Sequence, residues 1–286
     1  MHVPVMLAES LEYLAVKPDG VYLDATCGLG GHTGAIARRL TTGLVLACDR
    51  DAESLELARA NTADCASRIR FHQTLFSKVG EVLAAEGIPQ LDGLIADLGV
   101  SRLQLTAGER GFSLLAAGPL DMRMSRDMPE TAADLVNHLP ETALANLIFR
   151  LGEERRSRRI ARAIVRARPI QTTTQLAKLI EGVAPRTGKL HPATRTFLAL
   201  RLAVNRELEE TEALVAALPG LLKSGGRAVI ISFHSLEDRI VKRGFQALAK
   251  QGRARLLTRG VVRPPEEEIR DNPASRSARL RALERL

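Results

Sequence analysis

The chain contains no tryptophan, and aromatic residues make up only 3% of its 286 positions. Aromatic side chains form the platforms on which unpaired bases stack in many proteins that bind single-stranded nucleic acid. Their scarcity therefore disfavours nucleic-acid recognition that depends mainly on stacking. Any contact with RNA would have to rely on arginine, shape and hydrogen bonds.

Cysteine is also scarce, and Cys27, Cys48 and Cys65 are the only examples. Three is an odd number, and the spacings between these residues match neither a disulfide framework nor a zinc site. We therefore expect three small buried hydrophobic side chains, and no metal site.

Two kinds of segment that direct a chain to a membrane or out of the cell are missing. No apolar run is long enough to cross a bilayer. The first residues, Met1-His2-Val3-Pro4, lack the basic segment, apolar stretch and small-residue cleavage site of a secretion signal. Hydrophobic residues make up 45% and charged residues 26% of the chain, as in ordinary globular domains. We expect a cytoplasmic protein without a membrane partner.

Positive charge is what the sequence has in excess. Lysine and arginine outnumber the acidic residues by 41 to 33, which gives a formal net charge of +8 and an isoelectric point near 9.9. Clustered cations raise the local concentration of anions and release counterions from nucleic acid. The charge suggests a polyanionic partner, although charge alone leaves that partner open.

Short apolar segments alternate with amphipathic segments in the first third of the chain. Apolar residues recur at helical spacing between the apolar segments. The alternation predicts a β-α-β-α-β-α-β series, that is, a parallel sheet covered by helices. The predicted strands begin at Gly20, Gly43, Ile69 and Leu91, and the predicted helices begin at His32, Asp51 and Ser77.

The middle of the chain has a different composition. From about Ser101 to Arg206 it consists of helical segments rich in Ala, Leu and Arg, and the β/α alternation resumes at Gly225. We predict an α/β core made of residues 1–105 and 207–286, with a helical insertion at 106–206. Residues 235–250 predict a further helix. The segments 254–264 and 277–286 alternate as a closing strand pair, although the final one could equally be a helix.

The segment from Asp24 to Gly34 reads DATCGLGGHTG and follows the first predicted strand. Glycines let a backbone turn sharply and approach a ligand, and the helix that follows offers N–H groups to an anionic group. A tight turn without a ligand is the plain alternative. The nicotinamide fingerprint G-x-G-x-x-G would place its third glycine at position 33, where this chain has Thr33. The mismatch favours a different nucleoside cofactor.

Three residues at the ends of later predicted strands are candidates for the same site. Asp49 ends the second strand, where a carboxylate can accept bonds from both hydroxyls of an unphosphorylated ribose, although it could instead serve the following helix. Phe76 follows the third strand and could line an adenine pocket or belong to the core. Asp97 follows the fourth strand, at the edge of the sheet where ligands bind in open α/β folds.

Long sequence runs distributed in order along the chain resemble one family. On these runs, the whole chain resembles the bacterial small-subunit ribosomal RNA cytosine-N4 methyltransferases, the RsmH (formerly MraW) family. The runs are HVPVMLAESL from His2, DATCGLGGHTGAIA from Asp24, ACDRD from Ala47, ADLGVS from Ala96 with Gln104-Leu105 after it, ERGFS from Glu109, GPLDMRM from Gly118, GEERRSRRIARAI from Gly152, HPATRTFLALRLAVNRELEE from His191, SFHSLEDRIVK from Ser232 and NPASRSARLRA from Asn272.

The resemblance implies a Rossmann-like class I methyltransferase core, a helical module that helps to recognise RNA, and S-adenosylmethionine as cofactor. The target it implies is a cytosine of 16S rRNA at the decoding centre, within the small ribosomal subunit or its precursor, and a homodimer follows by analogy. The rival interpretations are a non-catalytic RNA-binding assembly factor and a nicotinamide-dependent oxidoreductase. The cofactor residues implied by the resemblance are Gly30, Gly31, His32, Asp49, Phe76, Asp97 and Gln104.

Asp97 is the candidate catalytic residue for transfer to a cytosine. The exocyclic nitrogen is a poor nucleophile because its lone pair is delocalised into the ring, so a group that takes its proton would help. A weak base suffices, since the amine becomes strongly acidic as the methyl group bonds. Asp97 could instead bind only the methionine end of the cofactor.

Candidate RNA contacts come from three further segments. Arginines crowd residues 150–168, where they outnumber acidic partners and suggest an amphipathic helix that touches phosphates. A glycine-punctuated loop could close over the cofactor or cytosine, or could simply be held by salt bridges. A lone histidine and a late turn could face the substrate, or could cap a helix and redirect the chain. The candidates are Arg155, Arg156, Arg158 and Arg159; Arg110, Phe112, Asp121 and Arg123; and His234, Asn272, Ser275 and Arg276.

Overall fold

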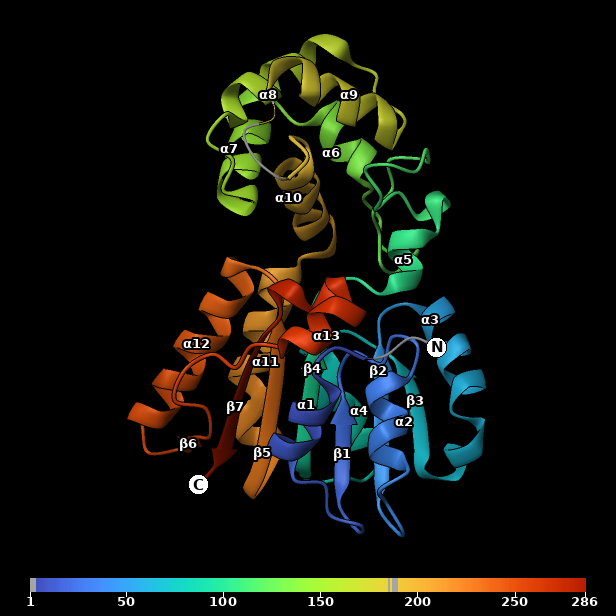
Figure 1. The fold of residues 1–286 in the computed structure, drawn as a ribbon, viewed down its shortest axis with the longest axis vertical. Coiled ribbons are helices and arrows are strands. Elements are labelled where there is room, and N and C mark those ends of the chain that lie inside the picture. The colour runs from blue at the N-terminus through green and yellow to red at the C-terminus, as the bar shows by residue number, and fades with distance from the viewer. Residues whose placement is uncertain (1–3, 185, 187–189) are drawn as a thin grey trace. The chain divides into compact units, whose positions relative to one another are not determined.

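The computed structural model describes residues 4–184, 186 and 190–286 (Figure 1). The chain divides into two compact units, one within residues 1–99 and 208–286 and the other within residues 100–207. The second unit begins earlier than the predicted insertion at residue 106, because Ser101 already caps its first helix, α5 (Arg102–Thr106). Among the described residues, no helix is both long and apolar enough to span a membrane.

A seven-stranded sheet forms the centre of the first unit, in the order β3-β2-β1-β4-β5-β7-β6. The strand β7 is antiparallel to both of its neighbours, and the other pairs are parallel. This Rossmann-like sheet confirms the predicted α/β class. The strands are β1 (Val21–Asp24), β2 (Leu44–Asp49), β3 (Ile69–Gln73), β4 (Leu91–Asp97), β5 (Leu222–Ser232), β6 (Ala254–Leu256) and β7 (Arg279–Arg285).

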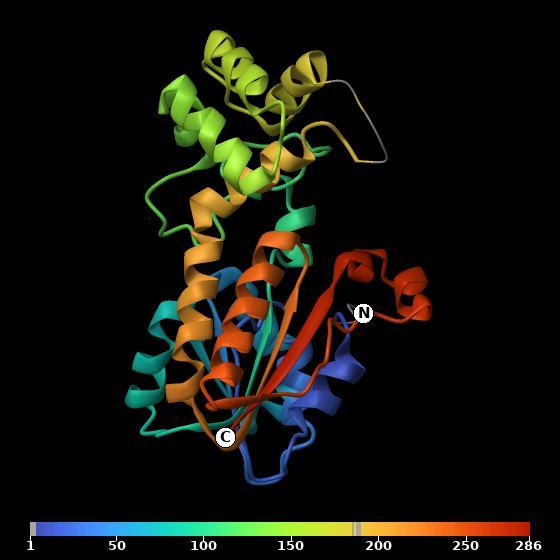
Figure 2. The ribbon, with the colours of Figure 1, turned by 90° about the vertical axis from the view of Figure 1, so that its left-hand side faces the viewer.

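Helices cover both faces of this sheet (Figures 1 and 2). One hydrophobic cluster joins one face to α1 (Leu7–Leu14), α2 (Gly31–Ala37) and α3 (Ala52–Asn61). A second cluster joins the other face to α4 (Val79–Ala85), α11 (Glu207–Leu221) and α12 (Ser235–Lys250). Burial of both faces explains why the central strands are nearly continuous hydrophobic runs.

The second unit is helical and has its own core. Its helix α7 packs against α8 and α10, and α8 also packs against α6 and α9. Leu144, Ile148, Ile160 and Ile164 lie fully buried between these helices. Besides α5, its helices are α6 (Ala132–His138), α7 (Glu141–Gly152), α8 (Ser157–Ala167), α9 (Thr173–Val183) and α10 (Thr194–Asn205).

Two late predictions are confirmed and one is wrong. Residues 235–250 form α12, and the final segment is the strand β7 paired with β6. The arginine-rich segment 150–168 is not one helix, because Glu153 adopts a left-handed conformation (φ 49°) that ends α7 before α8 begins at Ser157. Arg155 and Arg156 therefore precede α8, whereas Arg158 and Arg159 lie in its first turn.

The sequence pattern predicted no helix at three places where the structure has one, which are α1, α11 and the short helix α13. The C-terminal part adds α13 (Glu266–Asp271) before β7. Cys27, Cys48 and Cys65 are buried free thiols, as predicted, and burial raises the pKa of each. The 3-10 segments are η1 (Ala63–Arg68), η2 (Phe76–Lys78), η3 (Gly108–Arg110) and η4 (Pro273–Ser277).

Candidate functional site

The glycine turn after β1 is built for close backbone packing. Gly30 has φ +85°, a conformation that side chains disfavour, and it caps the start of α2. A Cβ atom at Gly30 would lie 3.0 Å from Thr62 Cγ2 and 3.2 Å from Ala58 Cβ. The Gly30 N–H donates to the Cys27 carbonyl at 2.8 Å, which closes the turn. Glycine at this position therefore satisfies both the backbone conformation and the limited space.

Asp24 fixes the base of the same turn. Its side chain is 1% exposed and accepts hydrogen bonds from the Thr26 N–H at 3.1 Å and from the Thr33 hydroxyl at 2.6 Å. Burial raises the pKa of Asp24 to about 6, although these hydrogen bonds oppose the shift, and the nearby Asp49 charge adds to it. The turn thus rests on a carboxyl group that burial makes hard to ionise.

Asp49 links the end of β2 to the glycine turn. One carboxylate oxygen accepts the Gly28 N–H at 2.7 Å and the other accepts the Asp51 N–H at 2.9 Å. Burial raises the pKa of Asp49, against the effect of these two hydrogen bonds. The helix α3 is capped by Asp51 rather than by Asp49. The Asp49 carboxylate therefore connects the glycine turn after β1 to the start of α3, at the carboxyl edge of the sheet. Its oxygens keep further lone pairs for a ligand.

Asp97 ends β4 next to these groups. Its N–H donates to the Thr26 hydroxyl at 2.6 Å, which ties it to the turn after β1. Its Oδ1 atom is buried and has no hydrogen-bond partner among the described residues. Burial raises the pKa of Asp97 well above its usual value, and the charges of Asp24, Glu237 and Glu268 raise it further. A buried acceptor without a partner calls for an explanation.

Glu237 and Glu268 are site residues that the sequence pattern did not single out. Glu237, which is 1% exposed, accepts the N–H groups of Phe233 at 3.0 Å and His234 at 3.4 Å. A capping-box pattern, with Glu three residues after a capping residue, could have indicated it. Glu268 lies on α13 and accepts the Met6 N–H at 2.8 Å. No local signal predicts a contact between residues 262 positions apart.

The N-terminal segment lies against the glycine turn. A Cβ atom on Gly31 would come within 2.3 Å of Pro4 Cγ, so Pro4 packs directly on Gly31. Met6 is fully buried and is held by Glu268. The wall of the candidate site therefore includes residues from both ends of the sequence.

The other predicted cofactor residues fall into two groups. His32 is buried in the first turn of α2, beside Gly30 and Gly31. Phe76 is half-buried in η2 and packs against the hydrophobic cluster between the sheet and the helices α4, α11 and α12. Gln104 belongs to the second unit, where it is buried and its Oε1 accepts the Ser101 N–H at 3.0 Å. Six of the seven predicted residues therefore belong to the first unit and Gln104 to the second, and their shared role in binding a cofactor stays a prediction.

The loop candidates make structural contacts within the second unit. Arg110 is 3% exposed and donates to the carbonyls of Arg123 and Met124 at 3.1 and 2.8 Å. Phe112 is buried in the core of this unit. Asp121 and Arg123 form an ion pair at 2.8 Å, which lowers the pKa of Asp121. Of the two interpretations left open for this loop, these contacts support the salt-bridged one.

Exposed arginines surround the start of α8. Arg155, Arg158 and Arg159 are exposed, whereas Arg156 is half-buried and its N–H donates to Glu154 at 2.8 Å. Ile160, Ala161 and Ile164 of the same helix lie in the core. The helix therefore has one apolar face and one cationic face, as predicted.

The late candidates occupy capping and turn positions. His234 is the N-cap of α12, and its Nδ1 accepts the Glu237 N–H at 3.5 Å. Its Nε2 lies 3.1 Å from Glu237 Oε1. Ser275 is buried and donates to the Asn272 carbonyl at 2.8 Å, and Arg276 is exposed in the same 3-10 turn. His234 thus caps α12, Ser275 and Arg276 lie in the 3-10 turn before β7, and contact of these residues with substrate stays a prediction.

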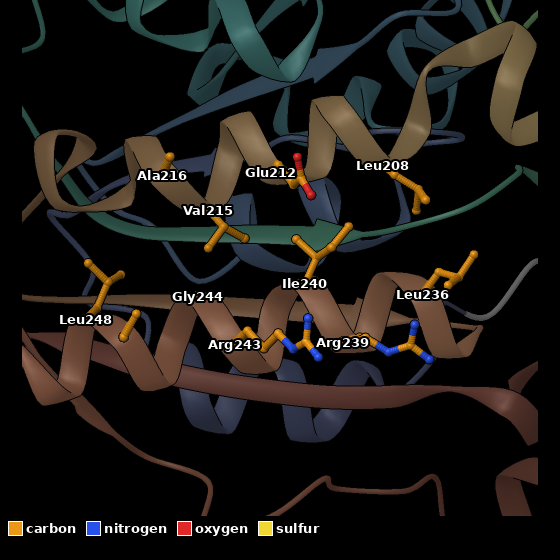
Figure 3. A pocket seen from close by; sticks show the side chains of 11 residues that line it. Leu208, Glu212, Val215, Ala216, Leu236, Arg239, Ile240, Arg243, Gly244 and Leu248 are labelled. Carbon is orange, nitrogen blue, oxygen red and sulfur yellow. The ribbon is translucent and has the colours of Figure 1, made fainter. Parts of the chain in front are cut away.

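A cavity of about 510 Å³ lies elsewhere in the first unit, between α11 and α12 (Figure 3). Val215, Ile240 and Leu248 form apolar walls, and Arg239 and Arg243 project from α12. All of its lining residues come from these two helices. It is therefore distinct from the carboxyl edge of the sheet, where the candidate cofactor residues lie.

Comparison with known proteins gives concordant results. The family described as the MraW methylase family matches residues 1–286. A Solibacter usitatus protein named Ribosomal RNA small subunit methyltransferase H is 60% identical over 284 residues, covering 99% of both chains. A protein of the same name from Acidobacterium capsulatum is 50% identical, covering 99% of this chain and 98% of its own.

A solved structure supports the fold independently. The structure described as an rRNA-methylase from Clostridium thermocellum matches with a TM-score of 0.50 at 11% identity, over 100% of both chains. Identity this low concerns the fold alone, which is that of a Rossmann-like class I methyltransferase. The predicted fold class is thereby confirmed.

Proposed function

The chain belongs to the MraW methylase family, and from that membership we propose that it methylates the exocyclic N4 amine of a cytosine in the decoding region of bacterial 16S rRNA. Its cofactor is S-adenosylmethionine. The proposed acceptor rests on the family resemblance and on relatives named Ribosomal RNA small subunit methyltransferase H. The proposed substrate is the small ribosomal subunit or its precursor in the cytoplasm. Residues 106–206 are proposed to recognise its RNA. A homodimer stays a prediction.

The residues at the carboxyl edge fit S-adenosylmethionine, which carries a cationic sulfonium and an ammonium group. The observation that carries the proposal is the buried Asp97 Oδ1, which lacks a hydrogen-bond partner among the described residues. The acidic groups Asp24, Glu237 and Glu268 act on Asp97 and raise its pKa, so a cation there would be favoured. Asp49, beside the glycine turn, retains lone pairs for ribose hydroxyls.

S-adenosylmethionine, when bound, supplies an electrophilic methyl group attached to a positively charged sulfur. The cytosine N4 that takes this methyl group would have to give up one proton, which a residue of the chain must accept. Asp97 is the proposed acceptor of that proton. In the empty site its raised pKa favours the protonated form, and the positive charge of a bound donor would favour the carboxylate that accepts the proton. Thr26 holds the Asp97 backbone in place, so the carboxylate needs little reorganisation.

The cationic face of α8 is the proposed contact for the RNA backbone. Arg155, Arg158 and Arg159 are exposed there, and arginine pairs well with phosphate. The oxidoreductase alternative is excluded by membership of a methylase family. The non-catalytic assembly factor remains the alternative that an experiment must address.

The decisive experiment supplies the protein with methyl-labelled S-adenosylmethionine and small ribosomal subunits that lack this modification. The label should appear in one nucleoside, N4-methylcytidine, and mapping should place it in the decoding region. Label at another atom or another region would refute the proposed acceptor. Binding to the particles without any transfer would instead establish the assembly factor.

Replacing Asp97 with asparagine tests the proposed base. The D97N variant should lose about 10²–10⁴-fold in the rate of methyl transfer, because asparagine cannot accept the proton. Binding of S-adenosylmethionine, measured by calorimetry, separates loss of the base from loss of the donor. The matched control is D64N, at an exposed aspartate paired with Arg38. A D97N variant with wild-type transfer would remove Asp97 from the mechanism.

A further inference from the structure

Leu115 is the most exposed large hydrophobic side chain among the described residues, with 86% of its surface open to solvent. The other exposed large hydrophobic side chains range from 38% to 58%. Singly exposed leucines are normal on protein surfaces, so exposure alone assigns no role. The second observation is that the loop around Leu115 is firmly held.

The residues before Leu115 anchor the loop from one side. Phe112 is buried in the core of the second unit, and Leu114 packs against that core. Between them, the Ser113 hydroxyl accepts the N–H groups of Leu115 at 3.2 Å and Ala116 at 3.1 Å. These bonds fix the backbone at the point where the chain turns Leu115 outward.

The residues after Leu115 are tied to the start of α9. The Thr173 hydroxyl donates to the Ala116 carbonyl at 2.8 Å, and the Thr173 N–H donates to the Gly118 carbonyl at 3.0 Å. Gly118 lies so close to the chain that a Cβ atom there would be 1.9 Å from the Gly108 carbonyl oxygen. The loop is therefore held on both sides of an apolar side chain that it presents to solvent.

We propose that Leu115 is a wedge that inserts between stacked bases of the RNA substrate. The proposal rests on the proposed function, since an enzyme that modifies a base must take it out of its stack. Aliphatic side chains on nucleic-acid-binding proteins open base steps by insertion in this way. The chain has no tryptophan and few other aromatic residues, so an aliphatic side chain takes this role.

The surroundings of Leu115 favour a base step over a protein partner. Its neighbours Ser113, Ala116 and Ala117 are small, so the Leu115 side chain projects beyond the residues beside it in the loop. A stable protein interface needs a much larger area. Because hydrogen bonds hold the backbone on both sides of Leu115, we expect insertion to cost little conformational entropy. The exposed arginines of the same unit supply attraction to phosphates, and Leu115 supplies a contact that salt does not screen.

The test uses an RNA fragment that contains the methylated cytosine, with 2-aminopurine as the next base on its 3′ side. Binding of the wild-type protein should raise the 2-aminopurine fluorescence, because the base loses its stacking partner. The L115A variant should lose most of that rise and bind on the order of tenfold more weakly. The slope of log affinity against log salt should stay unchanged, since no charge is removed.

Three further variants sharpen the test. L115M keeps a long apolar side chain and should behave as the wild type. L57A removes the same atoms from a leucine that is 43% exposed on α3, and it should change nothing. T173V keeps Leu115 but removes the hydroxyl that holds the Ala116 carbonyl, so it should give a reduced fluorescence rise. An exposed leucine without a wedge function would not depend on Thr173.

The outcomes separate the wedge from the proposed function. If the wild type methylates the cytosine while L115A matches it in fluorescence and transfer, the wedge is wrong and the proposed function stands. If the wild type transfers no methyl group, the proposed function fails, and a fluorescence rise that L115A loses still supports the wedge. If L115A alters the sedimentation of the free protein and leaves the RNA signals intact, Leu115 serves self-association and the wedge is refuted.

Discussion

Ionised Asp24 should destabilise the first unit at neutral pH, and D24N should remove that effect. Asp24 is 1% exposed, and burial raises its pKa from 3.8 to about 6. A carboxyl whose pKa is higher in the folded chain binds its proton more tightly there. Its contribution to stability is therefore complete below pH 3.8 and is lost as the pH rises through 6.

The magnitude follows from the change in pKa on folding. A rise in pKa from 3.8 to about 6 corresponds to ~3 kcal/mol of unfolding free energy between the fully protonated and fully ionised limits. Roughly half of that, ~1.4 kcal/mol, is lost between pH 5 and pH 8. The Asp24 side chain is almost fully buried, so solvent screening reduces this figure little.

Tyrosine fluorescence gives a direct assay of the first unit. The chain has no tryptophan, and its two tyrosines, Tyr13 and Tyr22, both lie in that unit. Urea unfolding of the wild type and of D24N should be followed at pH 5 and pH 8. The stability of D24N relative to the wild type should rise by ~1.4 kcal/mol between these two values.

The D24N substitution also changes the unfolding free energy by an amount that does not vary with pH. This change arises because asparagine cannot accept hydrogen bonds from both Thr26 and Thr33, as the carboxylate does. It therefore cancels in the difference between pH 5 and pH 8. The D64N variant, at an exposed position, should show no gain of this kind. If the difference in unfolding free energy between D24N and the wild type is the same at pH 5 and pH 8, the reasoning is refuted.

Two other predictions address the cofactor turn and the cationic helix. G30A should weaken S-adenosylmethionine binding measured by calorimetry by at least tenfold, because it combines an unfavourable φ with crowding by Ala58 and Thr62, at a cost of about 1–3 kcal/mol. G87A has the same kind of φ (+66°) and open space, so it should leave binding unchanged, and equal effects of both variants would contradict the crowding argument. Replacing four arginines with alanine should make the dependence of log RNA affinity on log salt less steep, by about 0.7–0.9 for each phosphate that the protein no longer neutralises. The affinity for S-adenosylmethionine should stay the same. An unchanged salt dependence would count against phosphate binding. Those arginines are Arg155, Arg156, Arg158 and Arg159.

The parts of the fold that follow local rules were predictable from sequence. The strands β1 to β4 appear as apolar runs because parallel strands are buried on both faces. The break between α7 and α8 was not predictable, because the arginines continue through it and only the left-handed backbone of Glu153 marks the end of α7. Helix α1 was missed because no strand precedes it in the alternating pattern.

Some residues of the candidate site could likewise be predicted from local sequence rules, and others could not. Gly30, Asp49 and Asp97 follow predicted strands, so topology alone places them at one edge of the sheet. The contact between Glu268 and Met6 joins the two ends of the chain, and spacing carries no information about it. Arg110 appeared equally suited to substrate and to structure, and only its burial against two carbonyls favours the structural role.

The buried acids connect the stability of the fold with its chemistry. Asp24, Asp49 and Asp97 end three adjacent strands, and burial raises the pKa of each; the charge of Asp49 also raises the pKa of Asp24, and the charge of Asp24 also raises that of Asp97. An arrangement chosen for stability alone would replace such groups, since buried like charges are unfavourable. The positive sulfonium of a bound donor would offset the repulsion between these like charges, whereas the demethylated product carries no sulfonium charge. We therefore expect the same carboxyl groups that weaken the empty fold to favour the charged donor over its product.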